Sequence, residues 1–466
     1  MKTIIKFIFI FLVTIGLTNC SDDIIDKEPL DEVAPENLLQ TEAGFRTALD
    51  GVYAIMQEDF LGYNFCIYSI PEAINDDIIA GDPNGFTFEG SHSDIYPLAY
   101  DATAFQIEGF WRESYKAINN VNAIIKVART SNVTNKDAFL AEALGVRAML
   151  YYNLYRFFAP AYNTDANALA VPYKLETEDP LDIKPRNTNQ EVIDFVLNDL
   201  LEAVSLATND VNSYRMSKTA IEALTARVYH ETNDFSNAIT YAQRALTDGR
   251  YMLNTNAADL QKQWLEDDSD EIIFRIRFEE SDASFNAALL SIPIFFSFPY
   301  FVSDDLINLY DQTNDIRFAT YFEPEPFGSG AFYPKKHAST RTADDATFNP
   351  GATDIKLIRV PELHLILAEA YDKTENAGMA LNHLNILRNA RGLGDYVGSD
   401  LSNEILDERR RELAFEGFRF TDLKRLGLGF TRPDGTSLAP NANRFALPIP
   451  QLEIDRSGLN QNDGYQ

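Results

Sequence analysis

Apolar residues recur at intervals of three and four along several long stretches of the chain, a period that predicts amphipathic helices. The stretches lie at residues 42–53, 110–128, 138–158 and 190–207. Trp111 stands on the apolar face of the second stretch, so we expect it to pack in the core. The run from Glu271 to Phe278, rich in Ile and Phe, predicts a strand. A mainly α fold with a few short strands is therefore expected.

Two distant segments share the same internal spacing. Ala226, Tyr229 and Ala238 stand at the same intervals as Ala368, Tyr371 and Ala380, and a short polar turn interrupts each segment. Small residues at fixed offsets let two antiparallel helices approach closely, and the Tyr fills the groove between neighbouring pairs. This spacing is typical of the tetratricopeptide repeat. The alternative is two unrelated helical hairpins.

Three stretches lack a lasting period, at residues of about 59–108, 159–189 and 251–355. Structureless loops of this length are uncommon in a compact protein, and they are usually functional when they occur. We therefore expect a single domain over residues 37–466. It would be a tetratricopeptide-like helical-repeat scaffold with long loop insertions gathered on one face.

The N-terminus has the pattern of an export signal. Lys2 and Lys6 precede a short apolar run that is too short to span a bilayer and ends at Cys20. The segment around Cys20 resembles a lipobox, although Asn19 departs from the usual small residue. We predict a signal peptide at residues 1–19, lipidation of Cys20 and a tether at residues 20–36. The alternative is a plain secretory signal with a coincidental Cys.

Charge narrows the range of partners. The formal net charge is −30 and the acidic residues are spread along the chain, so nucleic acid is a poor partner and neutral or cationic ligands fit better. After Cys20 only Cys66 remains, and a lone thiol forms no internal disulfide. The exported fold is therefore expected to depend on its core.

Catalytic and metal-binding motifs are not evident. The five His residues lack metal-ligand spacing, and no Gly-x-Ser-x-Gly elbow occurs. Acidic pairs stand at Asp76-Asp77, Asp304-Asp305 and Asp344-Asp345, but sequence neighbours cannot show the carboxyl separation that a glycosidase needs. The acidic run 267–271 is expected to be a solvated loop. We predict a protein that is not an enzyme and needs no cofactor or metal.

The C-terminal half carries a more specific pattern. Residues 359–371, the charged block 408–425 and the closing segment 449–465 resemble the SusD/RagB family, and Asp463 stands where that family usually has Pro. The segments 111–122 and 142–152 agree. Charges of the block fall at helical intervals, so we expect many of them to pair internally and hold helices in register.

The resemblance implies a function. Members of the family are outer-surface lipoproteins of Bacteroidetes that bind glycans, or in some cases peptides, as lids on TonB-dependent transporters of the SusC type. It implies a nutrient-binding protein, lipid-anchored in the outer membrane and facing the extracellular side. Three alternatives stay open: a peptide-binding lid, an exported hydrolase on the same scaffold, and a purely structural lid.

A sugar-binding face combines flat aromatic rings with polar side chains. The insertion at 59–108 supplies both kinds, and a second aromatic group follows residue 295. The residues predicted to bind ligand are Tyr63, Asn75, Asp76, Asp77, Phe86, Tyr96, Tyr100 and Tyr300. In the alternative reading, these aromatic residues only pack the loops onto the scaffold.

Overall fold

The computed structural model describes residues 38–57, 63–80, 94–176, 183–208, 212–279, 300–325, 328–337 and 353–465. The longer helices are α3 (Glu42–Gln57), α4 (Tyr63–Ala73), α5 (Phe105–Thr130), α6 (Lys136–Phe158), α7 (Asn189–Leu206), α8 (Lys218–Glu231), α9 (Phe235–Thr247), α10 (Ala257–Leu265), α14 (Val360–Lys373), α15 (Ala377–Ala390) and α16 (Leu401–Leu413). The shorter ones are α12 (Asp304–Ile307), α13 (Phe318–Tyr321), α17 (Arg419–Arg425), η2 (Asn443–Phe445) and α18 (Gln451–Ser457). Each helix predicted from the apolar period is present, so the mainly α prediction is confirmed.

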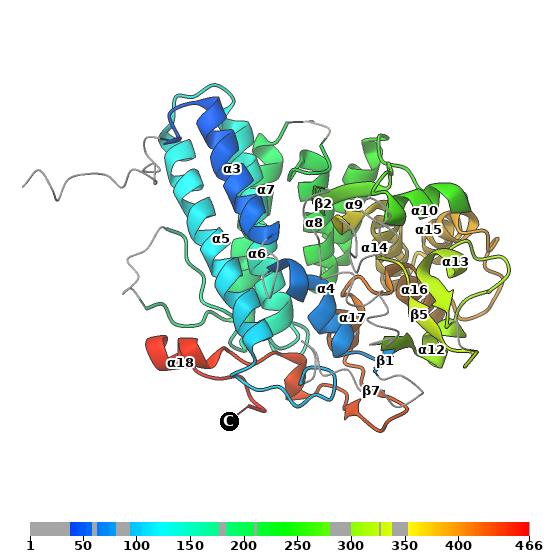
Figure 1. Cartoon of the computed structure of the whole chain (residues 1–466). Helices are drawn as coiled ribbons and strands as arrows, with labels where there is room; N and C mark the ends of the chain where they lie inside the picture. The colour runs from blue at the N-terminus through cyan, green and yellow to red at the C-terminus, as the bar shows by residue number, and fades with distance from the viewer. Residues whose placement is uncertain are drawn as a thin grey trace, which may run out of the picture.

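Helices α3, α5, α6 and α7 lie side by side at one end of the molecule (Figure 1). Helix α6 packs between α5 and α7, and every residue from Phe139 to Phe158 is buried. A helix that is covered on all sides can hold polar side chains only if they are paired. Arg147 of α6 meets this condition, since it donates to both Asp199 oxygens at 2.7 and 2.8 Å and to Asn122 Oδ1 at 2.8 Å. Trp111 is 3% exposed, which confirms its place in the core.

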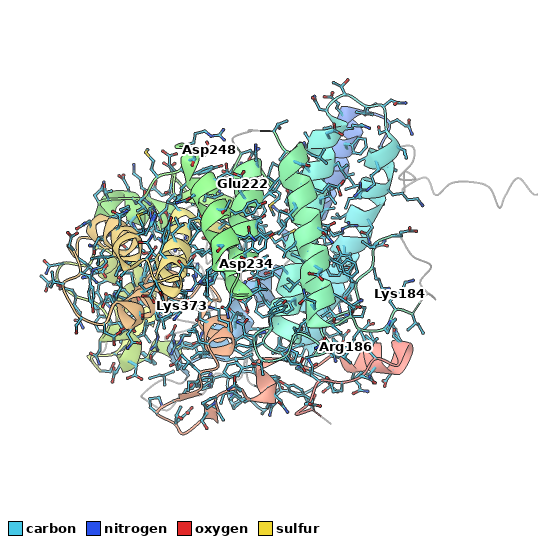
Figure 2. The ribbon with its side chains drawn as sticks, turned by 180° about the vertical axis from the view of Figure 1, so that it is seen from behind. Lys184, Arg186, Glu222, Asp234, Asp248 and Lys373 are labelled. Atoms are coloured by element: carbon cyan, nitrogen blue, oxygen red, sulfur yellow. The ribbon has the colours of Figure 1, made fainter. Side chains whose placement is uncertain are left out.

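The two segments of matched spacing form the helix pairs α8–α9 and α14–α15. Their Ala residues are fully buried where the helices touch, and α14 also packs against α9. Figure 2 shows Asp234, at the turn of the first pair, near Lys373, at the end of α14. The Tyr371 hydroxyl accepts a hydrogen bond from Gln243 Nε2 at 2.8 Å and so links the two pairs. The repeat prediction is confirmed.

Of the short antiparallel strand pairs in the described residues, three involve the inserted regions and one lies nearer the C-terminus. They are β1 (Ile78–Ala80) with β3 (Tyr300–Val302), β2 (Ile272–Ile276) with β6 (Ile355–Arg359), β4 (Phe322–Pro324) with β5 (Phe332–Pro334), and β7 (Phe430–Thr431) with β8 (Ser437–Leu438). Strand β2 confirms the strand predicted near residue 272. The insertions are also more structured than their lack of period suggested, because they contain α4, α10 and α12.

The core has two main parts. One large cluster runs through the helical scaffold, and a second gathers Trp264, Tyr310, Tyr321 and Phe415 beneath the β1–β3 pair. Lys336 and His337 enter this second cluster, with the Lys336 ammonium 3.9 Å from the Tyr321 ring centre and 4.6 Å from the Trp264 ring centre. Every helix within the described residues is too short or too polar to cross a membrane.

Candidate functional site

The β1–β3 ladder brings together several residues that were predicted to bind ligand. Asn75, Asp76 and Asp77 directly precede β1, and Tyr300 begins β3 opposite Ala80. The rings of Tyr96 and Tyr300 lie 5.9 Å apart. Five of the eight predicted residues therefore gather at one place, although the 59–108 insertion and residue 300 are far apart in sequence.

Arg432 stabilises the turn before β1 and the ring of Tyr96. Its guanidinium lies 3.9 Å from the Tyr96 ring centre and donates to the main-chain oxygens of Ala73, Asn75 and Tyr96. Such an arginine satisfies the carbonyl groups of a turn and supports an aromatic ring at once. The turn before β1 is thus anchored by a residue more than 300 positions away, which no local pattern predicts.

Tyr100 lies elsewhere. Its ring packs against Arg444 at 4.9 Å and against Tyr465 at 5.9 Å, and its carbonyl accepts from Arg444 Nη2 at 2.6 Å. The side chain of Tyr63, Phe86 and the lipidation candidate Cys20 fall outside the described residues.

The predicted aromatic residues are covered by protein. Tyr96 is 7%, Tyr300 3% and Tyr100 2% exposed, because each ring is packed against an arginine or another ring. In this structure these rings serve packing, as the alternative interpretation of the loops expects. Ligand binding through them stays a prediction.

Asp76 and Asp77 form ion pairs with the charged block. Both Asp76 oxygens accept from Arg419, at 2.7 and 2.8 Å, and Arg410 Nε donates to Asp77 Oδ1 at 2.7 Å. Burial alone would raise the pKa of Asp76, but Arg419 and Arg410 outweigh it and hold that pKa below its usual value. Burial raises the pKa of Asp77, and Arg410 offsets this only in part.

This arrangement bears on hydrolysis. A glycosidase separates the pKa values of two carboxyl groups, and each group must reach the substrate. Asp77 is fully buried and Asp76 has both oxygens bound to Arg419, so the pair offers no free carboxyl group to a sugar. Asp304 and Asp305 are exposed in the first turn of α12, and Asp344-Asp345 falls outside the described residues. Asp76 and Asp77 are therefore engaged in structural ion pairs with Arg419 and Arg410.

The charged block around Glu408 is structural, as predicted, and its charges pair both within the block and with other elements. Arg409 pairs inside the block, with Asp422 at 2.8 Å. Glu412 instead accepts from Arg317, Arg359 and Arg391 at 2.9–3.1 Å. Internal pairing is confirmed for several charges of the block, since Arg411 also pairs with Glu408 and Arg425 with Asp422. Glu412 instead turns toward the core, where arginines of other elements converge.

The acidic run 267–271 was expected to be solvated, and this holds for the exposed Asp268 and Asp270 but is wrong at the two ends of the run. Asp267 is 4% exposed and pairs with Lys356, while Glu271 is fully buried and accepts from Arg359 at 2.7 Å and from Arg391 at 3.0 Å. The strand that follows pulls both residues into the core beside three cations. Within the described residues, no three His, Cys, Asp or Glu side chains converge as a metal site.

A cavity of about 330 Å³ between α5 and α18 joins an aromatic edge to polar groups. Trp111, Tyr115, Asn119, Lys174 and Glu453 are among the residues that line it. No local pattern predicts this cavity, because its walls come from three separate parts of the chain and Trp111 has the spacing of a core residue.

Comparison with known proteins places these features in a family. Residues 29–230 match a family model described as starch-binding and associating with the outer membrane, and residues 323–465 match the SusD family model. A SusD-like protein of Formosa agariphila is 26% identical over 99% of both chains. The starch-binding protein SusD of Bacteroides thetaiotaomicron is 32% identical over 24% of this chain and 22% of its own.

Solved structures show the same fold. A SusD superfamily protein from Bacteroides vulgatus aligns with a TM-score of 0.81 at 24% identity, covering 92% of this chain and 100% of that one. Another, from Bacteroides thetaiotaomicron, aligns with a TM-score of 0.80 at 23% identity, covering 92% and 100%. With matches along both halves of the sequence and a shared helical-repeat scaffold, the chain belongs to the SusD/RagB family of carbohydrate-binding proteins.

Proposed function

We propose that the protein is a lipid-anchored lipoprotein of the outer membrane, facing the extracellular side. In this role it binds oligosaccharides and passes them to a SusC-type TonB-dependent transporter. The family and its described association with the outer membrane support this role. The segment before Cys20, with the features of a lipoprotein signal, supports the anchor.

The single structural observation that carries glycan binding is the β1–β3 ladder. It sets Ala80 opposite Tyr300, with the Tyr96 ring beside that of Tyr300. In the sequence, Phe86 and Phe88 follow Ala80, and Phe295, Phe296 and Phe298 precede Tyr300. Aromatic rings combined with polar side chains such as Asn75 suit the apolar faces and hydroxyl groups of sugars.

Binding is tested with the mature chain lacking its lipid, first on a glycan array and then by calorimetry. Oligosaccharide binding in the micromolar to millimolar range is expected. Phe86→Ala should weaken it about tenfold or more, as loss of a stacking aromatic side chain does. Val397→Ala, a change at a 95% exposed apolar residue, is the matched control and should leave affinity unchanged.

A peptide ligand is the second candidate. Trp111 and Trp264 are the only Trp residues of the chain, and both are buried, so neither offers a wide stacking platform for a long polysaccharide. A peptide library is therefore run beside the glycans. Peptide binding without glycan binding would replace the sugar assignment. If the protein hydrolyses a substrate and Asp76→Asn abolishes that activity, the protein is an enzyme and the binding role is wrong.

Anchoring and partnership are tested in cells. Cys20→Ala should abolish labelling by radioactive palmitate and release the protein from the membrane fraction, since stable anchoring needs the acyl chains. Affinity purification of the lipidated protein should recover a large β-barrel. Recovery of that barrel by a protein that binds no small ligand would indicate a purely structural lid.

A further inference from the structure

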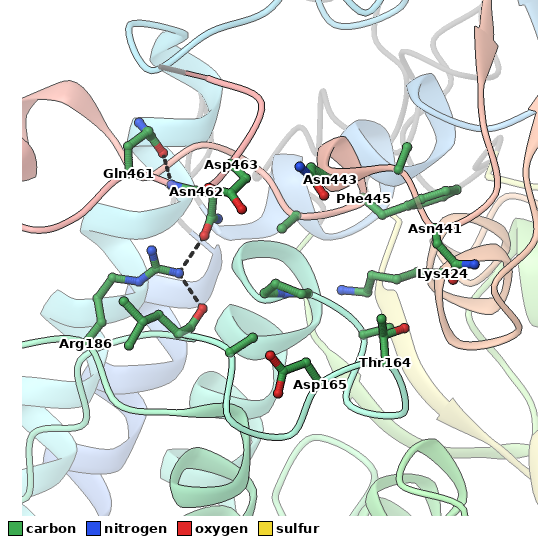
Figure 3. Close-up of a pocket in the computed structure, with 16 residues that line it drawn as sticks. Thr164, Asp165, Arg186, Lys424, Asn441, Asn443, Phe445, Gln461, Asn462 and Asp463 are labelled. Atoms are coloured by element: carbon green, nitrogen blue, oxygen red, sulfur yellow. Dashed lines mark hydrogen bonds between the residues drawn. The ribbon is translucent and has the colours of Figure 1, made fainter.

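A second cavity lies where the C-terminal segment crosses the end of α6 (Figure 3). Its volume is about 330 Å³, and its walls come from residues 160–169, Arg186, Lys424 and the segments 441–446 and 461–463. It shares no lining residue with the predicted ligand-binding set, so it does not depend on the segments 81–93 and 280–299.

Two buried cations reach this cavity from opposite sides, as Figure 3 shows. Arg186 is 8% exposed and donates to the carbonyl oxygens of Leu169, Ala170 and Asn460 and to Asn462 Oδ1, at 2.5–2.9 Å. Lys424 is 3% exposed and donates to the carbonyl oxygens of Arg156 and Ala159. Within the described residues, all of these acceptors are carbonyl oxygens, and none is a carboxylate.

Several buried arginines elsewhere have carboxylate partners, although in the described part of the chain Arg432 is bound by carbonyl oxygens alone. Arg147 pairs with Asp199, Arg227 with Glu362 and Arg425 with Glu369, at 2.5–2.7 Å. Hydrogen bonds to carbonyl groups orient a cation but do not neutralise it, and a buried charge without a counter-charge is costly. Burial accordingly lowers the pKa of Lys424 to about 7 and that of Arg186 to about 10, and Glu231 acts on Lys424 only through space. An anion in the cavity would supply the missing charge.

The side chains at the rim of the cavity restrict the chemical class of anion that can bind. Asp165 and Asp463 line the cavity and are exposed, so they disfavour a dianion such as phosphate. Thr164, Asn441, Asn443 and Gln461 also line it, and hydroxyl and amide groups pair well with sugar hydroxyl groups. We propose that this cavity binds a hydroxylated monocarboxylate of sugar-acid size, with its carboxylate facing Arg186 and Lys424 and its hydroxyl groups facing the rim.

Calorimetry on the mature chain at mildly acidic pH tests the proposal with defined probes. D-glucuronate should bind about tenfold or more tightly than acetate, which has the carboxylate but not the hydroxyl groups. D-glucose, which has the hydroxyl groups but not the charge, should show no binding. Phosphate should bind more weakly than glucuronate because of the acidic rim.

Variants with opposite expected signs separate binding from loss of structure. Lys424→Met should weaken glucuronate binding about tenfold or more, the worth of a charged hydrogen bond. Asp463→Asn removes an exposed like charge and should strengthen binding about twofold to fivefold. A damaged fold would not tighten binding, so the second variant remains informative even if Lys424→Met unfolds.

Two further variants complete the test. Thr164→Trp places a large side chain at the exposed rim and should block binding, whereas Thr130→Trp, at the exposed end of α5, should not. Phe86→Ala should keep glucuronate binding, which distinguishes this cavity from the proposed glycan-binding face. Absence of glucuronate binding, equal binding of acetate, or binding unchanged in both Lys424→Met and Thr164→Trp would overturn the proposal.

Discussion

Single ionisable residues in this protein lie deep in the interior, where burial and specific partners decide whether they are charged. Glu72 is fully buried and accepts from the Gly417 amide at 2.7 Å and from Asn75 Nδ2 at 2.8 Å, with Asp77 nearby. Burial raises its pKa to about 8, and the charge of Asp77 adds to the effect. Two hydrogen-bond donors are not enough to keep such a carboxyl group ionised at neutral pH.

The proton on Glu72 predicts a pH-dependent stability. The folded state holds this proton up to about pH 8, while the unfolded chain releases it near 4.5, so raising the pH between these values favours unfolding. This group alone contributes a slope of about 1.4 kcal/mol per pH unit over that window. Glu72→Gln cannot titrate and should remove that slope in urea unfolding measured from pH 5 to pH 8. The exposed change Glu266→Gln should leave it in place.

At the scale of secondary-structure elements, close helix packing decides which side chains fit at two glycine positions. Gly145 lies in α6 where α8 crosses it, and a Cβ there would lie 2.5 Å from Met216 Cγ and 3.0 Å from Ile221 Cγ1. Gly51 lies in α3 with open space around the same position. An added methyl group is therefore expected to clash at Gly145 and to fit at Gly51.

Replacing each glycine by alanine should change stability with opposite sign. Gly51→Ala should stabilise the protein by about 0.5–1 kcal/mol, the helix-propensity difference. Gly145→Ala gains the same propensity but forces the buried Met216 and Ile221 side chains to shift, and overpacking of this kind costs about 1–3 kcal/mol. Urea midpoints at constant slope measure both changes. Stabilisation by both substitutions would mean that α6 and α8 can separate without cost.

At the scale of the whole molecule, one buried ion network joins the scaffold to its insertions. Glu412 of α16 meets Arg391 at the end of α15, Arg359 of β6 and Arg317 before α13. Glu271, next to β2, binds two of the same arginines. The helix pairs and the strand region are thus held together by charges that water does not reach.

Neutralising the centre of this network should destabilise the whole protein. Glu412→Gln leaves three buried guanidinium groups short of a counter-charge, which costs about 3–5 kcal/mol. Glu404→Gln is the control, because Glu404 pairs with Arg388 and Arg411 nearer the surface and should cost less than about 1 kcal/mol. Fluorescence of Trp264, in the second core, reports unfolding of the insertions. Equal losses from the two substitutions would contradict a central role for Glu412.

Much of the scaffold could be predicted from local pattern, and little of the site could. The spacing of Ala226, Tyr229 and Ala238 is repeated at Ala368, and both segments fold as the predicted helix pairs. Helix α4 escaped prediction because it contains Pro71 and lacks a clear apolar period. Tyr96 and Tyr300 were predicted as ligand contacts, but each is enclosed by the packing of distant segments.

The sequence by itself determined the paired helices, because their pattern repeats within a few turns of the chain, and it pointed to the family through the block at residues 408–425. Only the tertiary structure decided what the charges do. Asp76 meets Arg419 across 343 positions, and Glu271 meets Arg391 across 120. Such pairs cannot be predicted from local spacing in the sequence. Burial decides whether a carboxylate is solvated or paired, and burial is set by the packing of the complete chain.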